Sequence, residues 1–310
     1  MEGLKSPLGE CGRWLRLTVR TVSAWRVRHV LWLGSVARRT MVKSIEHDVL
    51  NVAQSAAYSA MVGLFPALIV AAAVAELLPF GASLQFQLAH FFARVLPSDV
   101  VPLLQTYFAA HPKNPQSTRA ILIAALVSMA GASSVIATLM EGFRRAYDLP
   151  VDCWSFWQRR RRAFALVPLS LLPFGIASLL VVFGHVVTRW FVGYLTPSIQ
   201  TPVYVVALAI RWVVALLGST GVIALIYHMG TPMRQAWHRT LPGAVVATGT
   251  WFVTTLIFGW YVTRYADYGR VYGSLGAGIA LLFWLYIISL CVLCGAEFNA
   301  QFFMDKTQGP

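Results

Sequence analysis

Long stretches of apolar residues separated by short polar segments dominate the pattern along the chain. The clearest stretch, Leu275 to Ala296, contains no acidic or basic side chain. Because an α-helix rises ~1.5 Å per residue, about 20 such residues cross the hydrocarbon layer of a membrane. The apolar stretches predict six spans, at about 49–78, 120–140, 163–187, 202–227, 242–262 and 273–298. We therefore expect an all-α fold, a polytopic transmembrane helical bundle over residues 49–302.

Three regions outside the spans have a different pattern. Residues 1–48 interleave arginines with tryptophans and aliphatic residues, which is typical of a basic amphipathic helix on a membrane surface. The pattern from about residue 83 to residue 110 predicts two short amphipathic helices on the outer side. Residues 303–310 predict a short cytoplasmic tail. A nucleic-acid-binding arm would resemble residues 1–48, but the neighbouring spans favour a lipid surface.

Composition and charge agree with a membrane protein and give it a direction. Of the 310 residues, 57% are hydrophobic and 12% charged, and the net charge is +13. Most lysines and arginines fall in residues 1–48, between the second and third spans, and between the fourth and fifth. Because this bias sets topology, both termini are expected in the cytoplasm. Anionic membrane lipids are the expected partners, nucleic acid is not, and the oligomeric state stays open.

Several polar residues fall inside the predicted spans, where they must face the bundle interior, water or a bound molecule. In the first span they share one helical face, and in the second they adjoin a Gly-Ala pair. A guanidinium inside the fourth span could bind an anion, or the span could begin later and the side chain reach outward to the interface. The candidates for a substrate path are Asn51, Gln54, Tyr58, Ser133, Ser134 and Arg211.

A second polar set gathers at the predicted cytoplasmic ends of the first, second and sixth spans. Glu297 could pair there with Arg144, Arg145 or His47, and such a cluster could be a structural latch between helices or a cytoplasmic gate. The candidates are His47, Asp48, Arg144, Arg145, Glu297 and Asn299. No metal site or cofactor is expected, because the carboxylates are scattered along the chain.

Small residues at several span positions permit close approach of two helices. A run of glycines at one end of a span also permits a helix break beside a polar cavity. The candidates for helix packing or a hinge are Gly131, Gly273, Gly276 and Gly278.

Short motifs in a fixed order carry a resemblance to a known family. They are His47-Asp48, Ala56-Ala57-Tyr58, Leu64-Phe65-Pro66, Gly131-Ala132-Ser133, Pro242-Gly243-Ala244, Tyr272-Gly273-Ser274-Leu275-Gly276-Ala277, Trp284-Leu285-Tyr286 and Gly295-Ala296-Glu297-Phe298-Asn299-Ala300. With these motifs the chain resembles the YihY/virulence factor BrkB family of bacterial inner-membrane proteins. The resemblance implies a helical fold of about six spans and a role in the cell envelope.

These features leave two functional hypotheses. The first is a transporter or flippase for an anionic lipid or envelope precursor, and the alternative is a structural or regulatory membrane protein that transports nothing. Some relatives are labelled as a ribonuclease, but a metal-dependent nuclease needs clustered carboxylates and histidines beside the scissile phosphate. The chain has no such cluster in sequence, so we do not expect an enzyme.

Overall fold

The computed structural model describes residues 32–76, 115–192, 197–233, 235–264 and 275–307, and we restrict the description to them. Every regular element in these ranges is helical. The expected surface helices at 83–110, most of the basic N-terminal segment, and Gly273 lie outside the described residues. The elements are a helical segment at 32–46, α2 (Val49–Glu76), α5 (Pro115–Ala146), the short 3-10 helix η1 (Val151–Cys153), α6 (Phe156–Val192), α7 (Pro197–Gly230), α8 (Trp237–Arg264) and α10 (Leu275–Thr307).

The long helices extend beyond the apolar stretches that predicted them. By length and apolar composition, four segments within the described residues can cross a membrane: Ile121–Ala146, Thr201–Gly230, Trp237–Val262 and Gly278–Phe303. The all-helical fold and its membrane-spanning character are thus confirmed, whereas the count of six spans is not. Helix α10 continues to Thr307, so the chain remains helical past the end of its apolar stretch.

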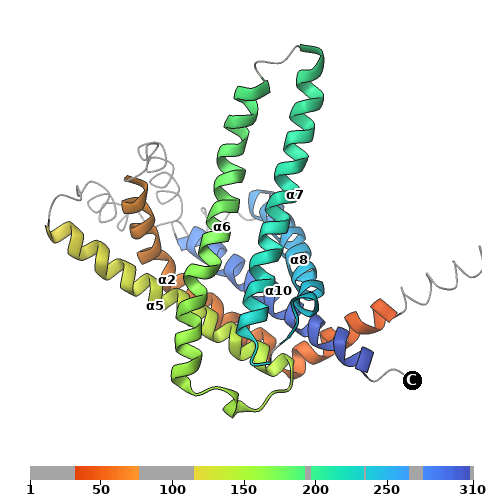
Figure 1. Cartoon of the computed structure of the whole chain (residues 1–310). Coiled ribbons are helices and arrows are strands. Elements are labelled where there is room, and N and C mark those ends of the chain that lie inside the picture. Colours follow the sequence, from red (N-terminus) through yellow and green to blue (C-terminus); the bar gives the residue numbers. More distant parts are fainter. Residues whose placement is uncertain (1–31, 77–114, 193–196, 234, 265–274, 308–310) are drawn as a thin grey trace, which may run out of the picture.

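The long helices contact one another in a ring that follows chain order (Figure 1). Helix α2 packs on α5, α5 on α6, α6 on α7, α7 on α8 and α8 on α10. Helix α10 closes the ring against α2 and also contacts α5. The last helix therefore touches the first, which brings residues near position 297 beside residues near position 47.

The buried core lies at one end of the bundle that these helices form. Its residues come from the first turns of α2, the second half of α5 and the C-terminal parts of α7 and α10, together with Ala244 and Ala247 of α8. A smaller cluster joins α5 to Ala163, Leu166 and Val167 near the start of α6. Toward their other ends α6 and α7 diverge from α2 and α5 (Figure 1), and most side chains of residues 201–217 are exposed or half-buried. The charge distribution of the sequence predicts that the packed end is cytoplasmic.

Glycines allow the backbones to approach closely at two helix crossings. A Cβ on Gly131 would lie 2.6 Å from the Cα of Gly63, so α5 and α2 meet there without side chains between them. A Cβ on Gly295 of α10 would lie 2.7 Å from both the Gly243 carbonyl oxygen and the Ala247 Cβ of α8. Gly276 is buried near the start of α10, and Gly278 is half-buried, with only the Met61 Cε near the place of its missing Cβ. Close contact of small residues is a common way for helices to associate in lipid, where hydrophobic burial between helices provides little free energy.

The α8–α10 crossing yields a stability test. In Gly243→Ala the new methyl would overlap the Gly295 carbonyl oxygen and lie 2.5 Å from the Asn299 Cγ, both in the packed core. We expect overpacking to cost about 1–3 kcal/mol and to lower the thermal midpoint of the purified protein. The control is Gly249→Ala on the same helix, where no atom lies within 4 Å of the new Cβ. Equal midpoints for the two variants would contradict the close crossing.

Candidate functional site

Two aspartates in left-handed backbone conformation position the polar groups at the packed end. Asp48 has φ 59° and separates the helical segment 32–46 from α2, and Asp148 has φ 51° just after α5. After α5, the Asp148 amide donates to the Arg145 carbonyl at 2.9 Å and the Leu149 amide to the Arg144 carbonyl at 3.0 Å. This is a Schellman ending with Asp in the place that Gly usually takes. Aspartate tolerates this conformation better than most residues, and unlike glycine it brings a carboxylate to the turn.

His47 joins two carboxylates from different parts of the chain. Its Nδ1 lies 2.6 Å from Glu297 Oε1 of α10, and its Nε2 lies 3.1 Å from Asp148 Oδ1. Glu297 is completely buried, and its Oε2 has no hydrogen-bond partner. A neutral imidazole can donate only one hydrogen bond. Both contacts are therefore satisfied when His47 is an imidazolium, or when Glu297 carries the shared proton.

The two arginines near the end of α5 pair with a carboxylate on their own helix. The Glu141 carboxylate forms ion pairs with the guanidinium groups of Arg144 at 2.7 Å, Arg145 at 3.4 Å and Arg159 of α6 at 3.1 Å. Arg144 also donates to the Leu149 carbonyl at 2.5 Å. Of the three partners that the sequence left open for Glu297, the structure selects His47. The arginines instead hold the turn after α5 and the start of α6 together.

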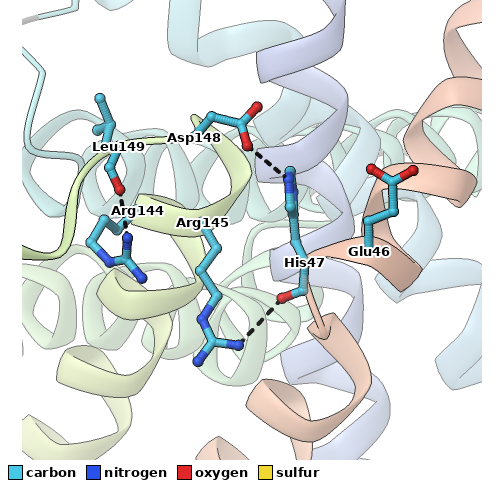
Figure 2. Close-up of a pocket in the computed structure, with 6 residues that line it drawn as sticks. All are labelled: Glu46, His47, Arg144, Arg145, Asp148 and Leu149. Carbon is cyan, nitrogen blue, oxygen red and sulfur yellow. Dashed lines mark hydrogen bonds and ion pairs between the residues drawn. The ribbon is translucent and has the colours of Figure 1, made fainter.

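A pocket of about 310 Å³ opens beside this cluster, lined by Glu46, His47, Arg144, Arg145, Asp148 and Leu149. Figure 2 shows the His47 ring directed at Asp148 and the Arg145 guanidinium directed at the His47 carbonyl, at 3.5 Å. Arg145 also lies 3.6 Å from the Asp48 carboxylate. The cations around this pocket are therefore largely engaged by neighbouring acids, and the pocket is better suited to holding three chain segments together than to binding an anion.

Asn299, two residues after Glu297 on α10, forms a second set of buried polar contacts. It is fully buried, its Oδ1 accepts from the Gly243 amide at 2.7 Å, and its Nδ2 donates to the Thr240 carbonyl at 3.0 Å. Pro242, which has no N–H to donate, lies next to Gly243 in α8. Tyr227 of α7 adds a bond from its hydroxyl to the Val292 carbonyl at 2.5 Å. The latch candidates thus join α2, α5, α8 and α10 at one end.

The path candidates are distributed over several environments. Asn51, Gln54 and Tyr58 are exposed on one face of α2, with Tyr58 67% exposed, and the Asn51 amide donates to Asp48 at 2.6 Å. Ser133 is completely buried, and its hydroxyl bonds back to the Ala130 carbonyl. Asn51, Gln54 and Tyr58 therefore lie on an outer surface of the chain, whereas Ser133 is sealed in the core.

Ser134 has a partner that sequence reasoning did not single out. The Arg160 guanidinium of α6 donates to the Ser134 hydroxyl at 3.0 Å and to the Ala130 carbonyl at 3.3 Å. It also lies 5.1 Å from the centroid of the Phe164 ring. Ser134 is 12 residues before the end of α5, or about 18 Å along the helix axis. The Arg160 guanidinium thus contacts residues in the middle of the candidate span Ile121–Ala146.

Arg211 lies within continuous helix, 14 residues after the start of α7, or about 21 Å along its axis. Its side chain is half-buried, and the Nε has no hydrogen-bond partner. It belongs to the same candidate span, Thr201–Gly230, as the core residue Tyr227, which follows it by 16 residues. The structure does not bring Arg211 together with Ser134 in any described contact.

Sequence reasoning did not place Glu141, Asp148 or Arg160 in the candidate site. The spacing of Glu141 to Arg144 and Arg145, three and four residues on, is a recognisable signal for ion pairs on one helix. Asp148 gave no local signal, because its contact to His47 depends on how α5 ends. Arg160 was hidden in the run Arg159 to Arg162, where only the orientation of α6 distinguishes four identical side chains. Within the described residues, no group of three or more His, Cys, Asp and Glu side chains could hold a metal ion.

Comparisons with known proteins agree with these membrane features. A family model described as Virulence factor BrkB matches residues 40–308. A UPF0761 membrane protein of Alteromonas mediterranea is 29% identical over 268 residues, which cover 84% of this chain and 85% of the relative. A Bacillus subtilis protein whose name calls it ribonuclease-like, YfkH, is 28% identical over 259 residues, covering 82% and 90%. No solved structure matches the chain at a significant level.

The buried carboxylate provides a test of the latch. In Glu297→Ala, His47 loses the partner at 2.6 Å, and a cavity forms at a fully buried position. Removing one member of a buried ion pair costs about 3–5 kcal/mol, so the thermal midpoint should fall by many degrees, with Glu297→Gln falling less. The control is Glu46→Ala, which breaks only the exposed pair to Lys43 at 2.7 Å and should change little. A midpoint for Glu297→Ala equal to that of Glu46→Ala would show that the latch adds no stability.

Proposed function

The chain belongs to the virulence factor BrkB family of membrane proteins, and we propose that in the bacterial inner membrane it transports or flips an anionic, amphipathic envelope molecule. A lipid or a lipid-linked envelope precursor has the required chemistry, an anionic head with a hydrocarbon part. The proposal includes a multi-pass topology of about six spans with both termini in the cytoplasm. The family match and the charge distribution support this topology.

The observation that carries the proposal is the contact of Arg160 with Ser134 and the Ala130 carbonyl. Arg160 precedes the predicted third span, but its guanidinium contacts residues in the middle of the candidate span Ile121–Ala146. A cation held there is costly, and in membrane proteins such residues commonly mark the route of a polar substrate. Within the described residues, Arg160 contacts the Ser134 hydroxyl, the Ala130 carbonyl and the Phe164 ring, so its positive charge is held by neutral groups. It can therefore attract a phosphate or carboxylate, which a guanidinium binds through two parallel hydrogen bonds.

The exposed polar face of α2 supports the same function. Helices α2 and α5 run antiparallel: Gly63 lies against Gly131, and Val52 lies beside Gly142. Residues of α2 between 52 and 63 are therefore level with residues of α5 between 142 and 131. Tyr58 of α2 therefore lies at about the depth of Ser134 of α5. Asn51, Gln54 and Tyr58 are exposed along α2; Asn51 donates to Asp48, but hydrocarbon would leave the polar groups of Gln54 and Tyr58 unsatisfied. A polar head group moving along this surface would supply partners for them.

In this proposal the latch is the closed gate of the cytoplasmic end. His47, Asp148 and Glu297 join three chain segments there, and the helices diverge toward the other end (Figure 1). A transporter must open and close its two ends in turn, and breaking a few buried polar contacts is a compact way to do so. Opening would separate α10 from the turn that carries His47.

The structural alternative rests on one observation, the sealed environment of Ser133. The packed end has no described path through it, and a scaffold would need none. Under this alternative, the exposed face of α2 would bind another protein. The ribonuclease-like name belongs to the Bacillus relative, and the site residues here give no reason to extend that activity to this chain.

A liposome assay with labelled lipids tests transport. Protein reconstituted in phosphatidylcholine vesicles should accelerate the transbilayer movement of a labelled anionic lipid relative to empty vesicles. Arg160→Ala should reduce the protein-dependent rate about tenfold, the size expected for losing a charge-assisted contact. Arg161→Ala is the matched control, because Arg161 is the next residue, is exposed and has no described contact. Equal rates with and without protein across several head groups would favour the structural alternative, and equal rates for both variants would remove Arg160 from the path.

The topology is tested separately with reporter fusions after Pro310. A reporter that functions only in the cytoplasm should be active, and one that functions only in the periplasm should be silent, because most Lys and Arg residues lie on the side of both termini. The reverse pattern would place the latch at the outer end and would overturn its role as a cytoplasmic gate.

A further inference from the structure

A second pocket, of about 470 Å³, lies between the first part of α6, the end of α7 and the segment before α8. Its lining residues are Arg162, Ala165, Leu166, His228, Met229, Thr231, Pro232, Met233 and Gln235. It shares no lining residue with the pocket beside His47. Arg162 is only two residues after Arg160 in α6, but neither Arg160 nor Ser134 is among the residues that line this pocket.

The charge of this pocket differs from that of the first. Arg162 contributes a guanidinium, and no carboxylate is among the lining residues. The guanidinium lies over the Trp154 ring, 4.6 Å from its centroid. A cation–π contact orients an arginine without neutralising its charge. The pocket therefore presents a held cation whose charge no lining acid balances.

Two further groups add hydrogen-bonding capacity. Tyr147 donates its hydroxyl to Gln235 Oε1 at 3.3 Å, and burial raises the pKa of Tyr147 to about 12, so the hydroxyl keeps its proton at physiological pH. With its oxygen engaged, the Gln235 amide has its two N–H groups left to donate. His228 stacks on Trp237 with ring centroids 4.3 Å apart, and its buried Nδ1 has no hydrogen-bond partner.

An apolar strip continues from the pocket along α6. Ala165 lines the pocket, and Leu169 and Leu172 follow it at four and seven residues, the spacing of one helical face. Both leucines are exposed, Leu172 to 67%. A soluble anion would use only the polar pocket, whereas a lipid would use the pocket and this strip together.

We propose that this pocket binds the phosphate head group of an anionic lipid, with an acyl chain along Ala165, Leu169 and Leu172. Arg162 binds two phosphate oxygens, and Gln235 and His228 complete the contacts to the head group. This site does not depend on the proposed transport, since a lipid can stay bound there as an anchor or regulator without crossing the membrane.

The test measures lipid binding directly, on the full-length protein in detergent micelles. Native mass spectrometry would follow titrations with dioctanoyl phosphatidic acid, dioctanoyl phosphatidylcholine and inorganic phosphate. Phosphatidic acid should bind at least tenfold more tightly than the other two, because only it combines an accessible anionic phosphate with acyl chains. Arg162→Gln should weaken phosphatidic acid binding about tenfold, the usual loss for a charge-assisted pair. Arg161→Gln, the exposed neighbouring arginine, should change it less than twofold.

A second variant examines the strip. The double variant Leu169→Gln, Leu172→Gln should weaken phosphatidic acid binding and leave any binding of inorganic phosphate unchanged. Because both positions are exposed, the variant should elute from a sizing column like the wild type. Equal binding of phosphatidylcholine would overturn recognition of the anionic phosphate, and equal binding of inorganic phosphate would overturn the lipid assignment. Equal affinities of the two arginine variants would overturn this pocket as the site. None of these results depends on whether lipid movement occurs in liposomes.

Discussion

A carboxylate buried among apolar helices is the constraint on which the packed end depends. Glu297 is fully buried, and an unpaired carboxylate there would be strongly unfavourable. Its partner, His47, must therefore lie against α10 although 250 residues separate the two in sequence. The left-handed Asp48 sets the turn that carries His47, and the Schellman ending of α5 brings Asp148 to the other ring nitrogen. One buried carboxyl group thus ties together the turn before α2, the end of α5 and α10 through His47.

Close backbone contacts make this arrangement possible. Gly243 and Gly295 bring α8 and α10 together, and the same crossing lets the Asn299 side chain reach the Gly243 amide and the Thr240 carbonyl. Larger side chains at the glycines would separate the helices and leave the amide of Asn299 without partners. Small residues and buried polar groups therefore act jointly here. The small residues permit close contact between the helices, and the hydrogen bonds of the polar groups fix their relative orientation. In lipid, where apolar surfaces gain little from meeting one another, this combination determines which helices associate.

The sequence predicted much of the fold and part of the site, and the reasons differ by residue. Uninterrupted apolar stretches located the long helices, since a charge-free run can be read locally. The helix ends were harder to predict from the sequence. Helix α6 begins at Phe156, seven residues before the expected span, because four arginines extend the helix out of the apolar region. His47, Glu297 and Asn299 were recognisable as polar groups beside spans. That His47 rather than Arg144 or Arg145 pairs with Glu297 depends on the ring of helices, and Asp148 joins only because α5 ends in a left-handed turn.

The run of four arginines at the start of α6 shows most clearly what a linear sequence conceals. Successive residues of an α-helix point about 100° apart, so four identical side chains face four directions. Arg159 pairs with Glu141, Arg160 reaches Ser134 and the Ala130 carbonyl, and Arg162 lies over Trp154 beside the second pocket. Arg161 is exposed. A positive-inside count treats all four as equal contributions to topology. Their surroundings differ: Arg159 is in an ion pair, Arg160 is held by neutral acceptors, Arg161 is exposed, and Arg162 is stacked on Trp154 beside a pocket with no lining acid. The four arginines lie on the same helix and carry the same charge, so they contribute equally to the topology signal. When the effects of substituting each one differ, the difference therefore reports on the surroundings of that side chain.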